Sequence, residues 1–81
     1  MENQKPIKWT PVQKRLAKNL SLILFTTGIK VSEVAKKSGV SAEIIKRYMD
    51  GKINSPSIYH VKKIAKVLEI SVGELLKESD E

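Results

Sequence analysis

The feature that most constrains the fold is the segment 31–52, VSEVAKKSGVSAEIIKRYMDGK, in which two short amphipathic stretches flank a single glycine. Val34 and Ala35 share one face of the first stretch, at helical spacing. Gly39 stands where a helix needs a residue in the left-handed conformation to end, and Ser41 is a good N-cap for a new helix. The segment therefore predicts two short helices that meet at a tight turn.

The second of these helices is predicted to have a buried face and a polar outer face. Ile45 and Tyr48 are three residues apart, so they point together toward the first helix. Ala35 is small enough to let the two helices cross closely. The residues left pointing outward are Ala42, Glu43, Lys46 and Arg47. A helix supported from behind, with such an outer face, is suited to the major groove of DNA.

Charge is divided unevenly along the chain, which carries a net +6 from 15 Lys and Arg against 9 Asp and Glu. Residues 1–66 hold 14 of the basic residues and 4 of the acidic ones, a net +10, whereas residues 67–81 hold 1 and 5, a net −4. A basic region favours a polyanionic partner, and nucleic acid before membrane, because no helix has the Trp- or Phe-rich face of an interfacial anchor. A lysine-rich surface that serves only solubility is the alternative.

Size and composition disfavour several classes of protein. Eighty-one residues fit one domain with one core, and with no cysteine the chain has neither disulfides nor a thiolate zinc site, as in a reducing cytoplasm. The apolar run 22–25 is far shorter than the ~20 residues that span a bilayer, and the polar start MENQKPIK is not a signal peptide. No nucleophile and base, carboxylate cluster, metal set or phosphate-binding glycine loop is present, so we expect neither an enzyme nor a cofactor or metal.

Periodic apolar positions predict five helices and no strand, an all-α domain. The first helix is predicted to begin with Thr10 as N-cap, Pro11 at the first helical position and Gln13 closing a capping box, and to end at Gly28. Its buried stripe comprises Val12, Leu16, Leu20, Ile23 and Leu24.

The second helix is predicted to cover 31–38 and the third to run from Ser41 to Gly51. Lys30 occupies the position before the second helix and is a poor N-cap, so a later start at Ser32 is an alternative.

Either Ser55 with Pro56, or Ser57, starts the fourth helix, and Ser71 with Glu74 forms a capping box for a short fifth helix. The fourth helix is predicted to bury Ile58, Val61, Ile64, Ala65 and Leu68, and the fifth carries Val72, Leu75 and Leu76. The chain then divides into a flexible basic arm at 1–9, a helical domain at 10–77 and an acidic tail at 78–81.

Taken in register, these motifs resemble the lambda repressor and Cro-like, or XRE-type, helix-turn-helix family. The resemblance runs from about 16 to 76 and rests on VAKKSGVS across the turn, GK at 51–52, PS at 56–57, and IAKVL and ISVGELL after them. It implies a compact five-helix lambda repressor-like DNA-binding domain, with the helix at about 41–50 in the major groove. Leu24 and Met49 replace an arginine and a glutamate that many relatives pair, so an apolar contact is expected there.

The candidate base contacts on the third helix are Ser41, Ala42, Glu43, Lys46 and Arg47. Arg47 leads this group because its planar guanidinium fits guanine O6 and N7, or else a phosphate, whereas Lys46 is better suited to phosphate. Glu43 either accepts from cytosine N4 or, as we favour, is a stabilising negative charge in the first helical turn. The resemblance implies phosphate contacts at the start of the second helix and in the loop after the third: Lys30, Ser32, Lys52, Asn54, Ser55 and Ser57.

The other conspicuous side chains are expected to be structural. His60 has no second ligand at a fixed offset, and Trp9 and Tyr59 are expected to pack at the edge of the domain. Three lysines on the fourth helix are expected to form a solvated face: Lys62, Lys63 and Lys66.

The resemblance implies a sequence-specific regulator of transcription, repressor-like, in the cytoplasm of a bacterium or encoded by a phage. Its partner would be double-stranded DNA, with a homodimer forming at least on an inverted-repeat operator, because one helix reads too few base pairs to select a site in a genome. The alternative is a protein-interaction helix-turn-helix module, antitoxin-like or antirepressor-type, with weak or no specific DNA binding. Glu43 and Val31, which do not favour phosphate, are the residues that support it.

Overall fold

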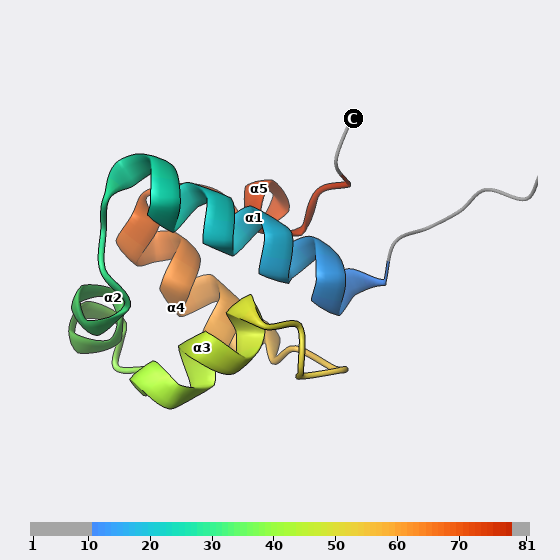
Figure 1. Ribbon diagram of the computed structural model, residues 1–81, viewed down its shortest axis with the longest axis horizontal. Coiled ribbons are helices and arrows are strands. Elements are labelled where there is room, and N and C mark those ends of the chain that lie inside the picture. Colours follow the sequence, from blue (N-terminus) through green and yellow to red (C-terminus); the bar gives the residue numbers. More distant parts are fainter. Residues whose placement is uncertain (1–10, 79–81) are drawn as a thin grey trace, which may run out of the picture.

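The computed structural model describes residues 11–78, which form five helices and no strand (Figure 1). The helices are α1 (Val12–Thr27), α2 (Val31–Ser38), α3 (Ala42–Met49), α4 (Ile58–Leu68) and α5 (Val72–Leu76). The predicted all-α class and five-helix architecture are confirmed. The basic arm at 1–9, Thr10 and positions 79–81 of the acidic tail lie outside the described residues.

One apolar core joins the five helices. α1 packs against α3 and α5, α2 packs against α3 and α4, and α4 packs against α5. The buried apolar residues are Leu16, Leu20, Leu24, Val34, Val40, Ile45, Tyr48, Val61, Ile64, Ala65 and Leu75. Each fully buried Leu, Ile or Val contributes about 1.5–3 kcal/mol of transfer free energy, so this core is the main source of stability. Leu24 is buried in this core and Met49 is partly buried against it, while the expected contact between the two side chains stays a prediction.

The turn between α2 and α3 has the predicted geometry. Gly39 is left-handed, with φ 78°, and its N–H donates to the Ala35 carbonyl at 2.9 Å. The hydroxyl of buried Ser38 accepts from the Val40 N–H at 3.1 Å, which adds a polar bond inside the turn. Ser41 caps α3, because its hydroxyl accepts from the Ile44 N–H at 3.2 Å. The turn therefore fixes where α3 begins relative to α2.

The starts of α1 and α2 differ from the prediction. Pro11 is the residue before α1 and not its first helical residue, because its ψ is 143° while its carbonyl already accepts from the Lys14 and Arg15 N–H groups. The alternative start of α2 at Ser32 is wrong, because the Lys30 carbonyl accepts hydrogen bonds from the N–H groups of Glu33 and Val34. Val31 is therefore already helical, and no side chain caps the helix.

The start of α4 is at Ser57, whose hydroxyl accepts from the His60 N–H at 3.4 Å. Ile58 is 57% exposed, so its predicted burial is wrong, while Tyr59 is 63% exposed and lies at the edge of the domain, as expected. Side chains in a helix point back toward its N-terminus, so those of the first turn extend past the end of the helix. Val61, a turn later, is buried as predicted.

α5 is tied to α1 by polar side chains at its C-terminal end. The Asn19 amide donates to the carbonyls of Leu75 at 2.8 Å and Lys77 at 3.0 Å, and Arg15 Nε donates to the Leu76 carbonyl at 2.7 Å. These bonds satisfy carbonyls that the end of a helix leaves without partners. The Ser71 hydroxyl accepts from the Glu74 N–H at 3.1 Å at the other end, which is one of the two bonds of the predicted capping box. The short fifth helix is thereby held at both ends.

Candidate DNA-binding surface

α3 is held by its inner face and open on its outer face. Ile45 and Tyr48 are 0% and 2% exposed and anchor the helix against the core. The side chains of Glu43, Lys46 and Arg47 are exposed on the other face, and Ala42 is half-buried beside them. α3 and the loop that follows it lie on the side of the molecule away from α5 (Figure 1). The arrangement leaves a short polar helix face accessible to a large partner.

Glu43 and Arg47 form a loose ion pair on this face. Arg47 Nη2 lies 3.8 Å from Glu43 Oε2, one helical turn away, and both side chains are largely exposed. An exposed pair of this kind contributes about 0–1 kcal/mol, because water screens it. Arg47 can therefore exchange the carboxylate for a guanine edge or a phosphate at little cost. Glu43 also lies in the first turn of α3, where a negative charge favours the helix.

Two backbone hydrogen bonds close the C-terminal end of α3, where the following loop begins. The Gly51 N–H donates to the Tyr48 carbonyl at 3.1 Å and the Lys52 N–H donates to the Arg47 carbonyl at 3.0 Å. Gly51 is left-handed, with φ 69°, and a Cβ added there would lie 3.7 Å from Ala17 Cβ on α1. This pattern is the Schellman motif, which fixes the direction in which the chain leaves the helix.

The same loop displays three of the predicted phosphate contacts. Lys52, Asn54 and Ser55 are all exposed, and Asn54 Oδ1 accepts from the Gln13 amide of α1 at 3.4 Å. Ser57 closes the loop and is half-buried, with its oxygen engaged as the cap of α4. Like the capping hydroxyl of Ser41, it keeps a proton that can be donated to a phosphate.

Lys30 and Ser32, the remaining predicted phosphate contacts, lie at the start of α2 and are exposed. The positive end of a helix dipole favours an anion at such a position. Four of the candidate base contacts thus lie on α3 and Ser41 caps it, whereas Lys30 and Ser32 lie at the start of α2.

A hydrogen-bonded group behind this surface was missed by the sequence reasoning. The hydroxyl of Tyr48 accepts from the Ser57 N–H at 3.1 Å and lies 2.9 Å from His60 Nδ1. The two rings meet edge to face, with centroids 5.9 Å apart. The signal for it was the Tyr on the buried face of α3, since a buried phenol needs a partner for its hydroxyl.

The lysines of α4 are only partly the solvated face that the sequence predicts. Lys62 and Lys66 are exposed, but Lys63 is half-buried and its Nζ lies 4.6 Å from the centre of the Tyr59 ring. This cation–π contact explains how Tyr59 is accommodated at the surface.

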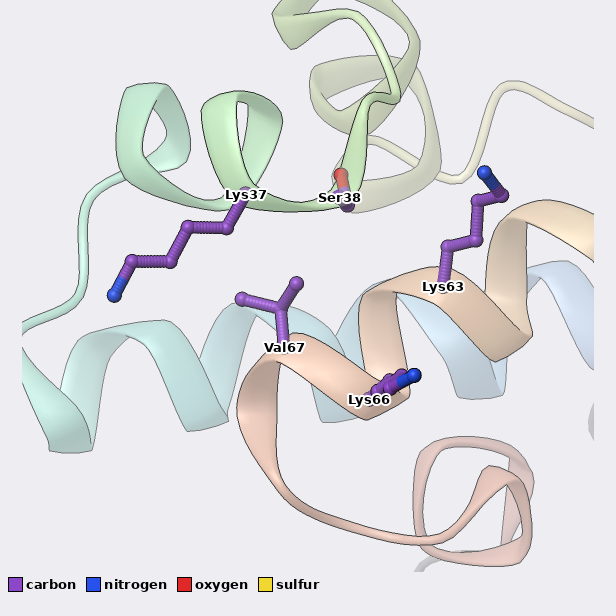
Figure 2. Close-up of a pocket in the computed structure, with 5 residues that line it drawn as sticks. All are labelled: Lys37, Ser38, Lys63, Lys66 and Val67. Carbon is purple, nitrogen blue, oxygen red and sulfur yellow. The ribbon is translucent and has the colours of Figure 1, made fainter.

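A hollow with a volume of about 380 Å³ lies between α2 and α4. Its lining residues are Lys37, Ser38, Lys63, Lys66 and Val67 (Figure 2). The amines of Lys37 and Lys63 point in opposite directions in Figure 2, so they do not converge on a common ligand. Lys37 Nζ also lies 3.2 Å from Glu33 Oε2. Within residues 11–78, no group of His, Asp and Glu is placed to hold a metal ion, and no helix is long and apolar enough to span a membrane.

Comparison with known proteins gives a consistent result. The Cro/C1-type helix-turn-helix DNA-binding domain matches residues 19–81. An uncharacterized HTH-type transcriptional regulator of Coxiella burnetii is 29% identical over 63 residues, which cover 78% of this chain and 29% of the relative. The HTH-type transcriptional regulator SinR of Bacillus licheniformis is 37% identical over 54 residues, covering 67% of this chain and 49% of the relative. The chain spans less than half the length of each relative, and no solved structure matches it significantly.

Proposed function

Because this chain belongs to the family of Cro/C1-type helix-turn-helix DNA-binding domains, we propose that it is a sequence-specific regulator of transcription that reads double-stranded DNA with α3. Members of this family bind DNA and are not enzymes. The observation that carries the proposal is the division of α3, in which Ile45 and Tyr48 are buried while Glu43, Lys46 and Arg47 are exposed. A rigidly backed helix can present side chains to base edges in fixed positions.

Base readout is assigned to the outer face of α3. Arg47 donates two parallel N–H groups to O6 and N7 of a guanine, and its weak bond to Glu43 is released as it does so. Lys46 reaches the phosphates or a base edge beside it. Ser41, Ala42 and Glu43, at the start of the helix, complete the contacted region and restrict which bases fit.

Phosphate binding is assigned to the two segments that flank α3. Lys52, Asn54, Ser55 and Ser57 follow it in the loop, and Lys30 and Ser32 precede it on α2. These contacts carry little sequence information but set the register of α3 in the groove. Because lysine binding to phosphate releases counterions, affinity falls steeply with salt.

The regulator acts on an inverted repeat as a pair of chains. One α3 spans eight residues and reads only a few base pairs, so a symmetric pair doubles the contacted sequence. The two half-sites then lie about 10 base pairs apart, one turn of the duplex. The chain works in the bacterial cytoplasm, where the chromosome lies, and a bound operator excludes or recruits polymerase.

The proposal is tested by selecting bound sites from a random DNA pool with the full chain. The selected duplex and a scrambled duplex of equal length are then titrated at two salt concentrations. We expect a preference of at least about 10³-fold for the selected duplex, and a linear fall of log affinity with log salt for both.

An absence of any selected sequence, with weak and equal binding to both duplexes, contradicts the proposal. That result favours the alternative of a protein-interaction module, for which Phe25 is a ready contact because it is 82% exposed on α1.

A further inference from the structure

We propose that Tyr48 and His60 are positioning residues for DNA binding, which couple the recognition helix α3 to the end of the phosphate-binding loop. This inference rests on the proposed function. The Tyr48 bridge is defined as the Tyr48 hydroxyl with the Ser57 N–H, 3.1 Å away, and His60 Nδ1, 2.9 Å away. It joins α3 to the first turn of α4.

The chemistry of the three groups determines which of them donates and which accepts in each hydrogen bond of the bridge. A phenol has one proton to donate and lone pairs that accept, so Tyr48, which accepts from the Ser57 N–H, has its own proton available for His60 Nδ1. With the Tyr48 proton directed at it, His60 Nδ1 acts as the acceptor in the bridge. Tyr48 supplies both functions from the core, because it is 2% exposed and its long ring carries the hydroxyl to the end of the loop.

The bridge fixes the far end of the loop, whose near end is already fixed. The bonds of Gly51 and Lys52 to the carbonyls of α3 hold the chain where it leaves the helix. Ser57, five residues later, is held by the hydroxyl of Tyr48 through its N–H, and its own hydroxyl accepts from the His60 N–H. Lys52, Asn54 and Ser55 thus lie on a segment attached at both ends to the same recognition helix.

The consequence is that base contacts and phosphate contacts are set by one rigid unit. If the loop moves relative to α3, phosphate contacts and base contacts cannot be made together, and affinity is lost without any change in the contacting residues. A recognition surface of this kind depends on a buried hydroxyl that never touches DNA.

The test compares substitutions that remove or keep the bridge. Tyr48→Phe removes only the hydroxyl, His60→Leu removes the acceptor, and His60→Gln keeps an acceptor oxygen. Tyr59→Phe is the matched control, because it deletes an exposed hydroxyl from the neighbouring residue of α4. Ile64→Val is the stability control, since it trims the buried face of α4 without removing a polar group.

Each variant of the 81-residue chain is titrated against the selected duplex at a temperature where circular dichroism shows it folded. We expect His60→Leu to lower affinity about threefold to tenfold, because it removes one hydrogen bond of the bridge, and Tyr48→Phe, which removes both, to lower affinity at least as much. The double variant should be no weaker than Tyr48→Phe, because that substitution already removes both hydrogen bonds of the bridge. His60→Gln, Tyr59→Phe and Ile64→Val should stay within about twofold of wild type.

A second readout needs no DNA. Amide hydrogen exchange should be faster at Ser57 and in the loop 52–56 in Tyr48→Phe, which deletes the acceptor of the Ser57 N–H, and unchanged in Tyr59→Phe.

Wild-type affinity in both Tyr48→Phe and His60→Leu overturns the positioning role, as does an equal loss in Ile64→Val, which would show that affinity merely follows stability. If the wild-type protein itself shows no preference for the selected duplex, the proposed function fails first and the positioning role fails with it. The wild-type titration in the same series separates these two failures.

Discussion

Substitutions at two residues in the left-handed conformation, Gly39 and Glu69, are expected to change stability in opposite directions. Gly39 has φ 78°, and a Cβ added there meets no atom within 4 Å, so Gly39→Ala costs only the backbone strain of a side chain in this conformation. Glu69 has φ 59° and already bears that strain, while its N–H and that of Ile70 close the end of α4. The strain is about 1–2 kcal/mol, and the entropy of the unfolded chain offsets about 0.4–1 kcal/mol of it. We expect Gly39→Ala to lose about 1 kcal/mol and Glu69→Gly to gain about 0.5–1 kcal/mol.

The assay is urea unfolding followed by far-ultraviolet circular dichroism. The midpoints should move in opposite directions while the dependence on urea stays the same, because neither substitution alters the buried surface. In a thermal scan, 1 kcal/mol corresponds to a shift of about 4–8 °C for a domain of this size. A Gly39→Ala variant as stable as wild type, or a Glu69→Gly variant that is less stable, refutes the reasoning from backbone conformation.

Two further predictions concern the core and the operator. Leu24→Ala should lose about 2–5 kcal/mol of unfolding free energy, whereas Phe25→Gln, at the next and largely exposed position, should change it by less than about 0.5 kcal/mol. Similar losses at the two positions would contradict the assignment of the buried face of α1. Footprinting on the selected site should show two protected half-sites about 10 base pairs apart, with cooperative binding. Protection of one asymmetric half-site by one chain at full affinity would rule out the symmetric pair.

Local rules were enough to predict most of the fold. Gly39 and Ser41 act within a few residues of themselves, so the turn between α2 and α3 followed from the sequence. The spacing of Ile45 and Tyr48 in turn predicted which face of α3 is exposed. The pairing of Glu43 with Arg47 was also within reach, because side chains four residues apart on a helix are neighbours.

The features that sequence reasoning missed depend on contacts between distant segments. Asn19 reaches Leu75 and Lys77 only because α5 returns to lie along α1. The exposure of Ile58 depends on where α4 begins relative to the helices that it packs against, and helical periodicity alone places that residue on the buried face. The Tyr48 bridge needs α3 and α4 in their final arrangement, and no spacing rule relates its residues.

The claim that α3 reads bases is tested most directly by comparing the sites selected by wild type, Arg47→Ala and Lys52→Ala. A lost bidentate contact to guanine should cost Arg47→Ala about 1–3 kcal/mol on the wild-type site and relax the preference at one base position in each half-site. Lys52→Ala, which removes a phosphate contact, should weaken binding to all sequences alike and still select the wild-type site. The slope of log affinity against log salt should fall by the release of about one counterion. If Arg47→Ala selects the wild-type sequence with wild-type affinity, α3 does not read the operator through Arg47 and the central assignment is wrong.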